Sequence, residues 1–225
     1  MSSPLIINKE STLVLPPVLC GSIGYYALMA SYGDVIIDNN CRYDKRRKLM
    51  HRYDIADVNG RLTLTIPVVK PSISNGATWN EVGVSTHGQW WNIHKVALWS
   101  AYGRTPFFEY YIDEFIPFLA PNNGKIIGSL IELNNGVDAV IRKILAIDSR
   151  VKYSLTEDEI LKLKSTSTQY IDYRNSDFSL NKIVEYYQVR ANQCGFIPNL
   201  SILDLIFNMG PESPLVLKKL IDINQ

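Results

Sequence analysis

The sequence predicts an α/β fold, in which an N-terminal βαβ-like unit and a β-hairpin are followed by a mostly helical C-terminal half. Two short apolar runs flank a helix-length segment in the first forty residues, an Asn-Gly dipeptide joins two runs near residue 60, and the apolar period becomes helical from Gln89 onward. At 225 residues, we expect a single domain over residues 1–225, with an α/β part (1–88) and a helical part (89–225).

Two predicted strands and the helix between them make up the βαβ-like unit. Residues 12–15 form an apolar run that a pair of prolines ends, and residues 34–38 have β-branched residues in their interior. Between these runs, the apolar residues from 21 to 29 predict a short helix that ends near Gly33. We therefore expect two parallel strands side by side.

The hairpin is predicted over residues 53–58 and 61–66. In the second run every other residue is apolar, and the connecting Asn59-Gly60 is a dipeptide favoured in type I′ turns because it accepts positive φ. From Gln89 onward, the sequence predicts helices and one loop. The helices cover residues 90–102, 106–117 (after Thr105, with Pro106 first), 129–144, a segment that begins with the capping box of Thr156 and Glu159, and two more that begin at Ser179 and Asn199; the loop covers 165–177.

Composition and charge exclude several classes of protein. With 23 Lys+Arg against 22 Asp+Glu, the net charge of +1 gives no global field for attracting nucleic acid. No apolar stretch approaches the ~20 residues of a membrane span, and no signal peptide is recognisable. The three cysteines show no C-x-x-C spacing, so neither a disulfide framework nor a metal site is implied. We expect a cytoplasmic protein without a membrane span, a metal or a nucleic-acid partner.

One polar stripe stands out on the predicted helix near the C-terminus. At about 100° per residue, Ser201, Asp204 and Asn208 share one narrow arc of an otherwise apolar helix, with Asn199 just before it. The stripe either faces a substrate, or Asn199, Ser201 and Asp204 cap the helix while Asn208 lies in its last turn. A substrate-facing Asp204 predicts that Asp204→Asn weakens ligand binding without loss of stability.

A basic run supplies the second set of candidates. Six of the 23 Lys+Arg fall within residues 42–52, including Lys45 and Arg52. Alternate members of such a run share a face of an extended chain, where they could bind phosphate or carboxylate. The alternative is a solvated charge run beside Asp44 and Asp54.

His94 is the strongest candidate for a general base, because it is one of only three histidines. Its helix places it in an apolar arc, however, so the alternative is a core histidine. Secondary candidates are Glu109 and the pair Asp172 and Arg174, which an extended chain would place on one side.

At these residues the chain resembles the WbqC-like family of bacterial proteins, whose members are associated with O-antigen and other surface-polysaccharide gene clusters. The strongest match is residues 195–213 (GFIPNLSILDLIFNMGPES), and the family pattern differs in having Asn where this chain has His51. Further matches are the basic run that ends at Arg52, Asn59-Gly60, His94, Ser100-Ala101-Tyr102 and Asp172-Tyr173-Arg174. For members in O-antigen clusters, the resemblance implies a glycine transferase role.

The resulting hypothesis is a cytoplasmic transferase that attaches a glycyl or similar acyl group to a sugar precursor of a surface polysaccharide. His94 and Asp204 are the predicted catalytic residues. The predicted residues for binding the activated, phosphate-bearing donor and the sugar acceptor are Lys45, Arg52, Tyr102, Asp172, Arg174, Asn199, Ser201 and Asn208. No cofactor is predicted. The alternative is a non-catalytic binding or assembly protein of a polysaccharide pathway, which is favoured if Arg52, His94 and Asp204 do not line one pocket.

Overall fold

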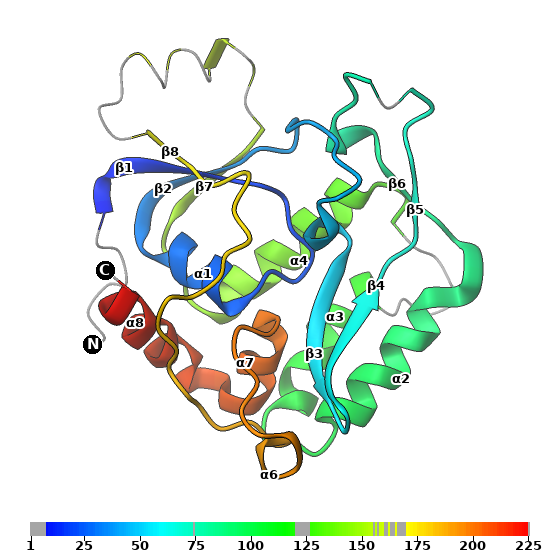
Figure 1. The fold of residues 1–225 in the computed structure, drawn as a ribbon, viewed down its shortest axis with the longest axis vertical. Coiled ribbons are helices and arrows are strands. Elements are labelled where there is room, and N and C mark those ends of the chain that lie inside the picture. The colour runs from blue at the N-terminus through cyan, green and yellow to red at the C-terminus, as the bar shows by residue number, and fades with distance from the viewer. Residues whose placement is uncertain are drawn as a thin grey trace.

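The computed structural model of the chain describes residues 8–73, 75–119, 127–154 and 170–224, with single positions (156, 158, 159, 162 and 165) between the last two ranges. Its centre is a four-stranded sheet in the order β7-β2-β1-β8, in which every neighbouring pair is parallel (Figure 1). The strands are β1 (Asn8–Leu15), β2 (Tyr32–Ile37), β7 (Arg150–Tyr153) and β8 (Tyr170–Asp172).

The predicted βαβ unit is confirmed. Strand β1 leads through helix α1 (Ile23–Ala30) into β2, and the two strands pair in parallel, with Leu15 opposite Ile37. Ser22 caps α1, because its hydroxyl accepts a hydrogen bond from the backbone N–H of Tyr25. The helix ends before β2 begins at Tyr32, so Gly33 lies inside the strand and does not terminate the helix.

Both faces of the two inner strands, β1 and β2, are buried. Leu13 and Leu15 of β1 belong to the main hydrophobic core, whereas the intervening Val14 packs on the opposite face in a small cluster with Ile36 and the partly buried Tyr170. This burial on two sides is typical of parallel sheets and explains why the predicted strands 12–15 and 34–38 are short, mainly apolar runs. The fold class predicted from the sequence is therefore confirmed.

The hairpin is confirmed as well, but its turn differs from the prediction. Strand β3 (Arg52–Asp57) pairs with β4 (Gly60–Thr65), and Asp57 lies opposite Gly60, so the turn residues are Val58 and Asn59. Gly60 has φ +102°, while Asn59 is not among the residues with positive φ. The predicted type I′ turn centred on Asn59-Gly60 is therefore wrong. The turn is centred on Val58 and Asn59, and only Gly60, the residue that follows it, takes positive φ.

The helices cover much of the second half of the chain. They are α2 (Trp90–Tyr102), α3 (Phe108–Leu119), α4 (Leu130–Ile144), α6 (Ala191–Cys194), α7 (Ile202–Met209) and α8 (Ser213–Asn224), and short 3₁₀ turns lie at 48–50, 79–81, 87–89 and 210–212. A second antiparallel pair consists of two strands of two residues each, β5 (Val68–Val69) and β6 (Gly83–Val84). Helices α2, α4 and α7 occupy the predicted segments. None of the helices in the described ranges is long and apolar enough to cross a membrane.

Several boundaries were predicted wrongly. Helix α3 begins at Phe108 and not at Pro106, since the hydroxyl of Thr105 donates to the carbonyl of Tyr102 instead of capping α3. Pro117 lies inside α3 and does not end it. Strand β8 occupies part of the predicted loop 165–177. Segment 179–187, which is predicted to be helical, is irregular. Helix α8, which follows α7, is absent from the prediction.

The capping box near residue 156 is present. The backbone N–H of Thr156 donates to the Glu159 carboxylate, and the backbone N–H of Glu159 donates to the Thr156 hydroxyl. Most of the helix that this box was predicted to begin lies outside the described residues.

Candidate functional site

A cavity of about 400 Å³ lies at the carboxyl ends of β1 and β8. It is lined by residues 18–22 after β1, by Asp177 and Phe178 in the segment after β8, by one face of the β3–β4 hairpin, and by residues before α7. The chain leaves β1 toward β2 on one side of the sheet and later returns to β8 on the other. This reversal is where open α/β sheets commonly bind ligands. We call the cavity the main pocket.

The hairpin contributes a polar face to the main pocket. Alternation along β3 buries Tyr53 and Ile55 in the core and leaves Arg52 and Asp54 on the opposite face. The Asp54 carboxylate accepts hydrogen bonds from the Thr63 hydroxyl opposite it (2.7 Å) and from an Arg61 Nη (2.8 Å). The charge of Asp54 is therefore matched within the hairpin.

Arg52 has no such partner among the described residues. Its Nε is buried without a hydrogen-bond partner, and no ion pair joins its guanidinium to a described carboxylate. Lys48 is exposed, also lines the main pocket and forms no ion pair with any carboxylate that the structure describes. A buried guanidinium N–H without an acceptor is costly. The main pocket therefore offers two unpaired cations to an anionic group such as a phosphate.

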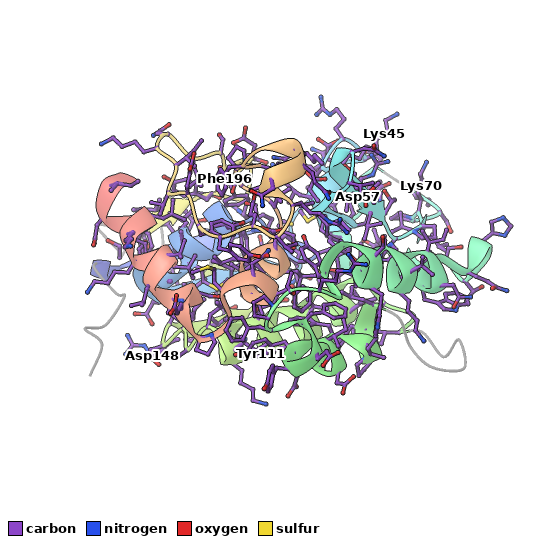
Figure 2. All side chains as sticks on the ribbon, turned by 90° about the horizontal axis from the view of Figure 1, so that it is seen from below. Lys45, Asp57, Lys70, Tyr111, Asp148 and Phe196 are labelled. Carbon is purple, nitrogen blue, oxygen red and sulfur yellow. The ribbon has the colours of Figure 1, made fainter. Side chains whose placement is uncertain are left out.

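The rest of the basic run points elsewhere. Lys45 is exposed at the surface and does not line the main pocket (Figure 2). Arg46 forms a bidentate pair with Asp44, and Arg47 donates to the side-chain oxygen of Asn175 and to a backbone carbonyl beside it. Of the two residues predicted here, the structure brings Arg52 into the pocket but not Lys45.

Asn199 and Ser201 line the main pocket, but their polar groups are already used. Asn199 accepts a hydrogen bond from the backbone N–H of Gly24 in the first turn of α1 and donates to the carbonyl of Phe178. Ser201 caps α7, and its hydroxyl donates to the carbonyl of Cys20. These two residues therefore build the wall of the pocket.

Gly24 is the position where this wall allows no side chain. A Cβ placed there would lie 2.4 Å from the carbonyl oxygen of Phe178. We expect Gly24→Ala to lower the free energy of unfolding by about 1–3 kcal/mol, because the wall must move to relieve the overlap. Thermal denaturation measures this loss, with Gly128→Ala as the control, since a Cβ at Gly128 would meet nothing within 4 Å. Equal melting temperatures for the two variants would show that the overlap at position 24 is relieved without loss of stability.

His94 lies in the core, with 1% of its surface exposed, and does not line the main pocket. Its Nε2 lies 3.2 Å from the carbonyl oxygen of Thr65, and its Nδ1 lies 3.1 Å from the hydroxyl of Tyr53. A carbonyl only accepts, so we place the proton on Nε2, and Nδ1 accepts from the phenol. Burial lowers the pKa of His94 to about 4. This geometry fits the core-histidine alternative, because neither nitrogen is free to act as a base.

Asp204 is fully buried in the first turn of α7 and does not line the main pocket. One carboxylate oxygen accepts from the hydroxyl of Tyr102 (2.9 Å), and the other accepts from the hydroxyl of Tyr186 and the side-chain amide of Gln188. Burial raises the pKa of Asp204, and these three donors oppose that shift. The polar groups that face Asp204 thus come from the protein itself.

The same holds for the rest of the polar stripe. Asn208 accepts from the backbone N–H of Val189 and donates to the backbone carbonyl of Asp204, and it is buried. The hydroxyl of Tyr102 also accepts from the backbone N–H of Ala56 in β3. Tyr102, Asp204 and Asn208 therefore hold α2, β3, α7 and segment 186–189 together.

Asp172 and Arg174 lie at the carboxyl edge of the sheet but do not line the main pocket. The Arg174 guanidinium donates to the buried Asp38 after β2 (2.7 Å) and to Asp172 at the end of β8 (2.7 Å). These two carboxylates raise the pKa of Arg174, with the Asp172 hydrogen bond as the largest cause. Arg174 thus ties the carboxyl ends of β2 and β8 together across β1.

The site assembled by the structure thus differs from the predicted one. Arg52, Asn199 and Ser201 line the main pocket, whereas His94 and Asp204 lie in separate buried networks. Sequence reasoning missed Asp54, Arg61 and Thr63 as pocket residues, although the alternation from Arg52 to Asp54 in β3 could have indicated the first. In the part of the chain that the structure describes, no group of three or more His, Cys, Asp or Glu could hold a metal ion.

Comparison with known proteins gives one match. A model of the WbqC-like protein family matches residues 17–175, a range that includes the hairpin and helices α1–α4. It contains Arg52 and His94 and ends before residues 195–213, where the sequence resemblance is strongest. No curated protein and no solved structure matches the chain.

Proposed function

Because the chain belongs to the WbqC-like protein family, we propose that it is a transferase that attaches a glycyl or similar acyl group to a sugar precursor of a surface polysaccharide. In this proposal the main pocket binds the phosphate of the activated donor. The observation that carries it is the unpaired guanidinium of Arg52, with Lys48 beside the same pocket.

The proposed transfer assigns a task to each charge in the main pocket. An amine or hydroxyl of the acceptor attacks the acyl carbon of the donor, the new acyl bond forms, and the phosphate leaves with the bonding electron pair. Arg52 and Lys48 stabilise the negative charge that develops on this phosphate. Asp54 lies two residues from Arg52 on the same face of β3. We propose that its carboxylate, and not the enclosed His94, takes the proton from the attacking amine or hydroxyl of the sugar.

The binding step can be tested without knowing the natural donor. We expect Arg52→Gln to weaken the binding of inorganic pyrophosphate by roughly 10- to 100-fold, since a hydrogen bond to a charged group contributes about 1.5–3 kcal/mol. Isothermal titration calorimetry at low salt measures this affinity. Lys45→Gln is the matched control from the same basic run and should bind like the unmodified protein. If the unmodified protein binds no pyrophosphate, or both variants bind equally, the donor pocket is wrongly assigned.

The separation of His94 and Asp204 from the pocket favours a second candidate, a non-catalytic binding or assembly protein of the same pathway. Mass spectrometry of the surface polysaccharide, made with and without this protein, distinguishes the two. A transferase predicts that the acyl substituent disappears when the protein is missing and is not restored by Arg52→Gln. A binding protein predicts a normal substituent on a reduced amount of polysaccharide.

A further inference from the structure

A second cavity, of about 320 Å³, lies next to the main pocket. It is lined by residues of α1, the start of β2, the end of α8 and segment 173–181. Phe178 lines both cavities. The two cavities are therefore neighbours that share this residue.

Phe178 is firmly held in this position. Its carbonyl accepts from the Asn199 side chain, and its backbone N–H donates to the Ser176 hydroxyl. Its φ of +57° is unusual for a residue with a side chain, and its ring packs edge-on against Tyr25 at a centroid distance of 5.0 Å. The wall is thus a fixed part of both cavities.

The two cavities differ in charge. Five charged side chains line the main pocket, whereas none of the described residues around the second cavity is charged. A charged ligand in the second cavity would lose water without gaining a counter-charge, which is unfavourable. The second cavity is therefore suited to a neutral ligand.

The second cavity also has a polar and an apolar side. Ala27, Leu28, Leu220 and Ile221 provide the apolar side, from α1 and α8. Hydrogen-bonding capacity comes from the phenols of Tyr32 and Tyr173 and from the amide of Asn181, none of which forms a side-chain hydrogen bond with a described residue. Tyr32 is nearly buried, whereas Tyr173 and Asn181 are exposed.

From these features we infer that the second cavity is a subsite for an uncharged sugar ring, and that this ring is the acceptor of the proposed transfer. The apolar side packs against the C–H face of the ring, and the phenols and the amide bind its hydroxyls. This inference rests on the proposed function, because it takes the donor phosphate to lie in the neighbouring main pocket, which shares Phe178 with the second cavity. The subsite itself requires only the second cavity.

Saturation-transfer NMR with two uncharged probes, methyl α-glucopyranoside and methyl N-acetyl-β-glucosaminide, tests this inference. We expect at least one probe to bind, and Tyr173→Leu and Asn181→Ala each to weaken that binding at least tenfold. Tyr173→Phe retains the ring and removes the hydroxyl, so it should lose most of the same affinity. Tyr187→Leu is the matched control, because Tyr187 is 57% exposed and lies outside both cavities. Thermal denaturation verifies that each variant is folded.

The possible outcomes separate this inference from the proposed function. Sugar binding that depends on Tyr173 and persists in Arg52→Gln supports the subsite. If the unmodified protein binds the sugar in this way but does not bind pyrophosphate, the sugar subsite is supported and the assignment of the main pocket to the donor is refuted. The inference is overturned if neither probe binds, if Tyr173→Leu and Tyr187→Leu bind equally well, or if the cavity binds uncharged octan-1-ol in preference to both sugars.

Discussion

Replacing Asp204 with alanine is expected to lower the free energy of unfolding by about 3–6 kcal/mol, since each buried donor left without an acceptor costs about 1–3 kcal/mol. The side chain is fully buried and accepts from Tyr102, Tyr186 and Gln188. Its removal leaves the hydroxyls of Tyr102 and Tyr186 without an acceptor and opens a cavity in the core, whereas the Gln188 amide still donates to the carbonyl of Ile197. Urea denaturation monitored by circular dichroism measures the loss.

Two further variants show whether the hydrogen bonds are the cause. Asp204→Asn retains one accepting oxygen and places an NH₂ group against the remaining donor, so we expect a smaller loss of about 1–3 kcal/mol. This differs from the result expected for a substrate-facing Asp204, which is unchanged stability. Asp222→Ala removes an exposed carboxylate on α8 and should change stability by less than about 0.5 kcal/mol. An Asp204→Ala variant as stable as Asp222→Ala would refute a structural role for the network.

Lowering the pH from about 6.5 to 4 should remove about 3 kcal/mol of stability through His94 alone. Burial lowers the pKa of His94 to about 4 in the folded protein, from the ordinary value of 6.5 for histidine. Between these two pH values the unfolded chain binds a proton that the folded protein does not. The contribution of His94 is therefore fully present above pH 6.5 and is lost as the pH falls toward 4.

The measurement compares urea denaturation at pH 7 and pH 4.5. His94→Gln should lose less stability between these pH values than the unmodified protein does. The His94→Gln variant still loses some stability as the pH falls, because burial also lowers the pKa of His51. His87→Gln is the control, since His87 is exposed and lies outside both cavities. An equal loss of stability between pH 7 and pH 4.5 in the unmodified protein and in His94→Gln would contradict the assignment of His94 as a neutral core residue.

Elements with strong local signals could be predicted from the sequence. The apolar runs of β1 and β2, the alternation in β4 and the cap at Ser201 each depend on neighbouring residues alone. Strand β8 could not be predicted, because three residues become a strand only by pairing with β1. Segment 179–187 was predicted to be helical, but the side chain of Tyr186 contacts Asp204 in α7, which local propensity does not reveal.

The site was predictable only in part, for a similar reason. The period of two along β3 was enough to place Arg52 on an open face. The polar stripe of α7 and the histidine of α2 could be picked out as candidates, but a buried polar group looks the same in sequence whether its partner is a ligand or the protein. Their partners, Tyr186 and Tyr53, come from other elements. The tertiary structure alone separates the two cases.

The position of β8 beside β1 also bears on how the chain is made. Leu15 ends β1 about 155 residues before Tyr170 begins β8, so a ribosome working at roughly 5–20 residues per second takes on the order of ten to thirty seconds to supply the missing neighbour. Until then one edge of the central strand has unpaired backbone groups, which invite pairing with other chains. Closing so long a loop also slows folding. The nascent chain is therefore most prone to aggregation during this interval.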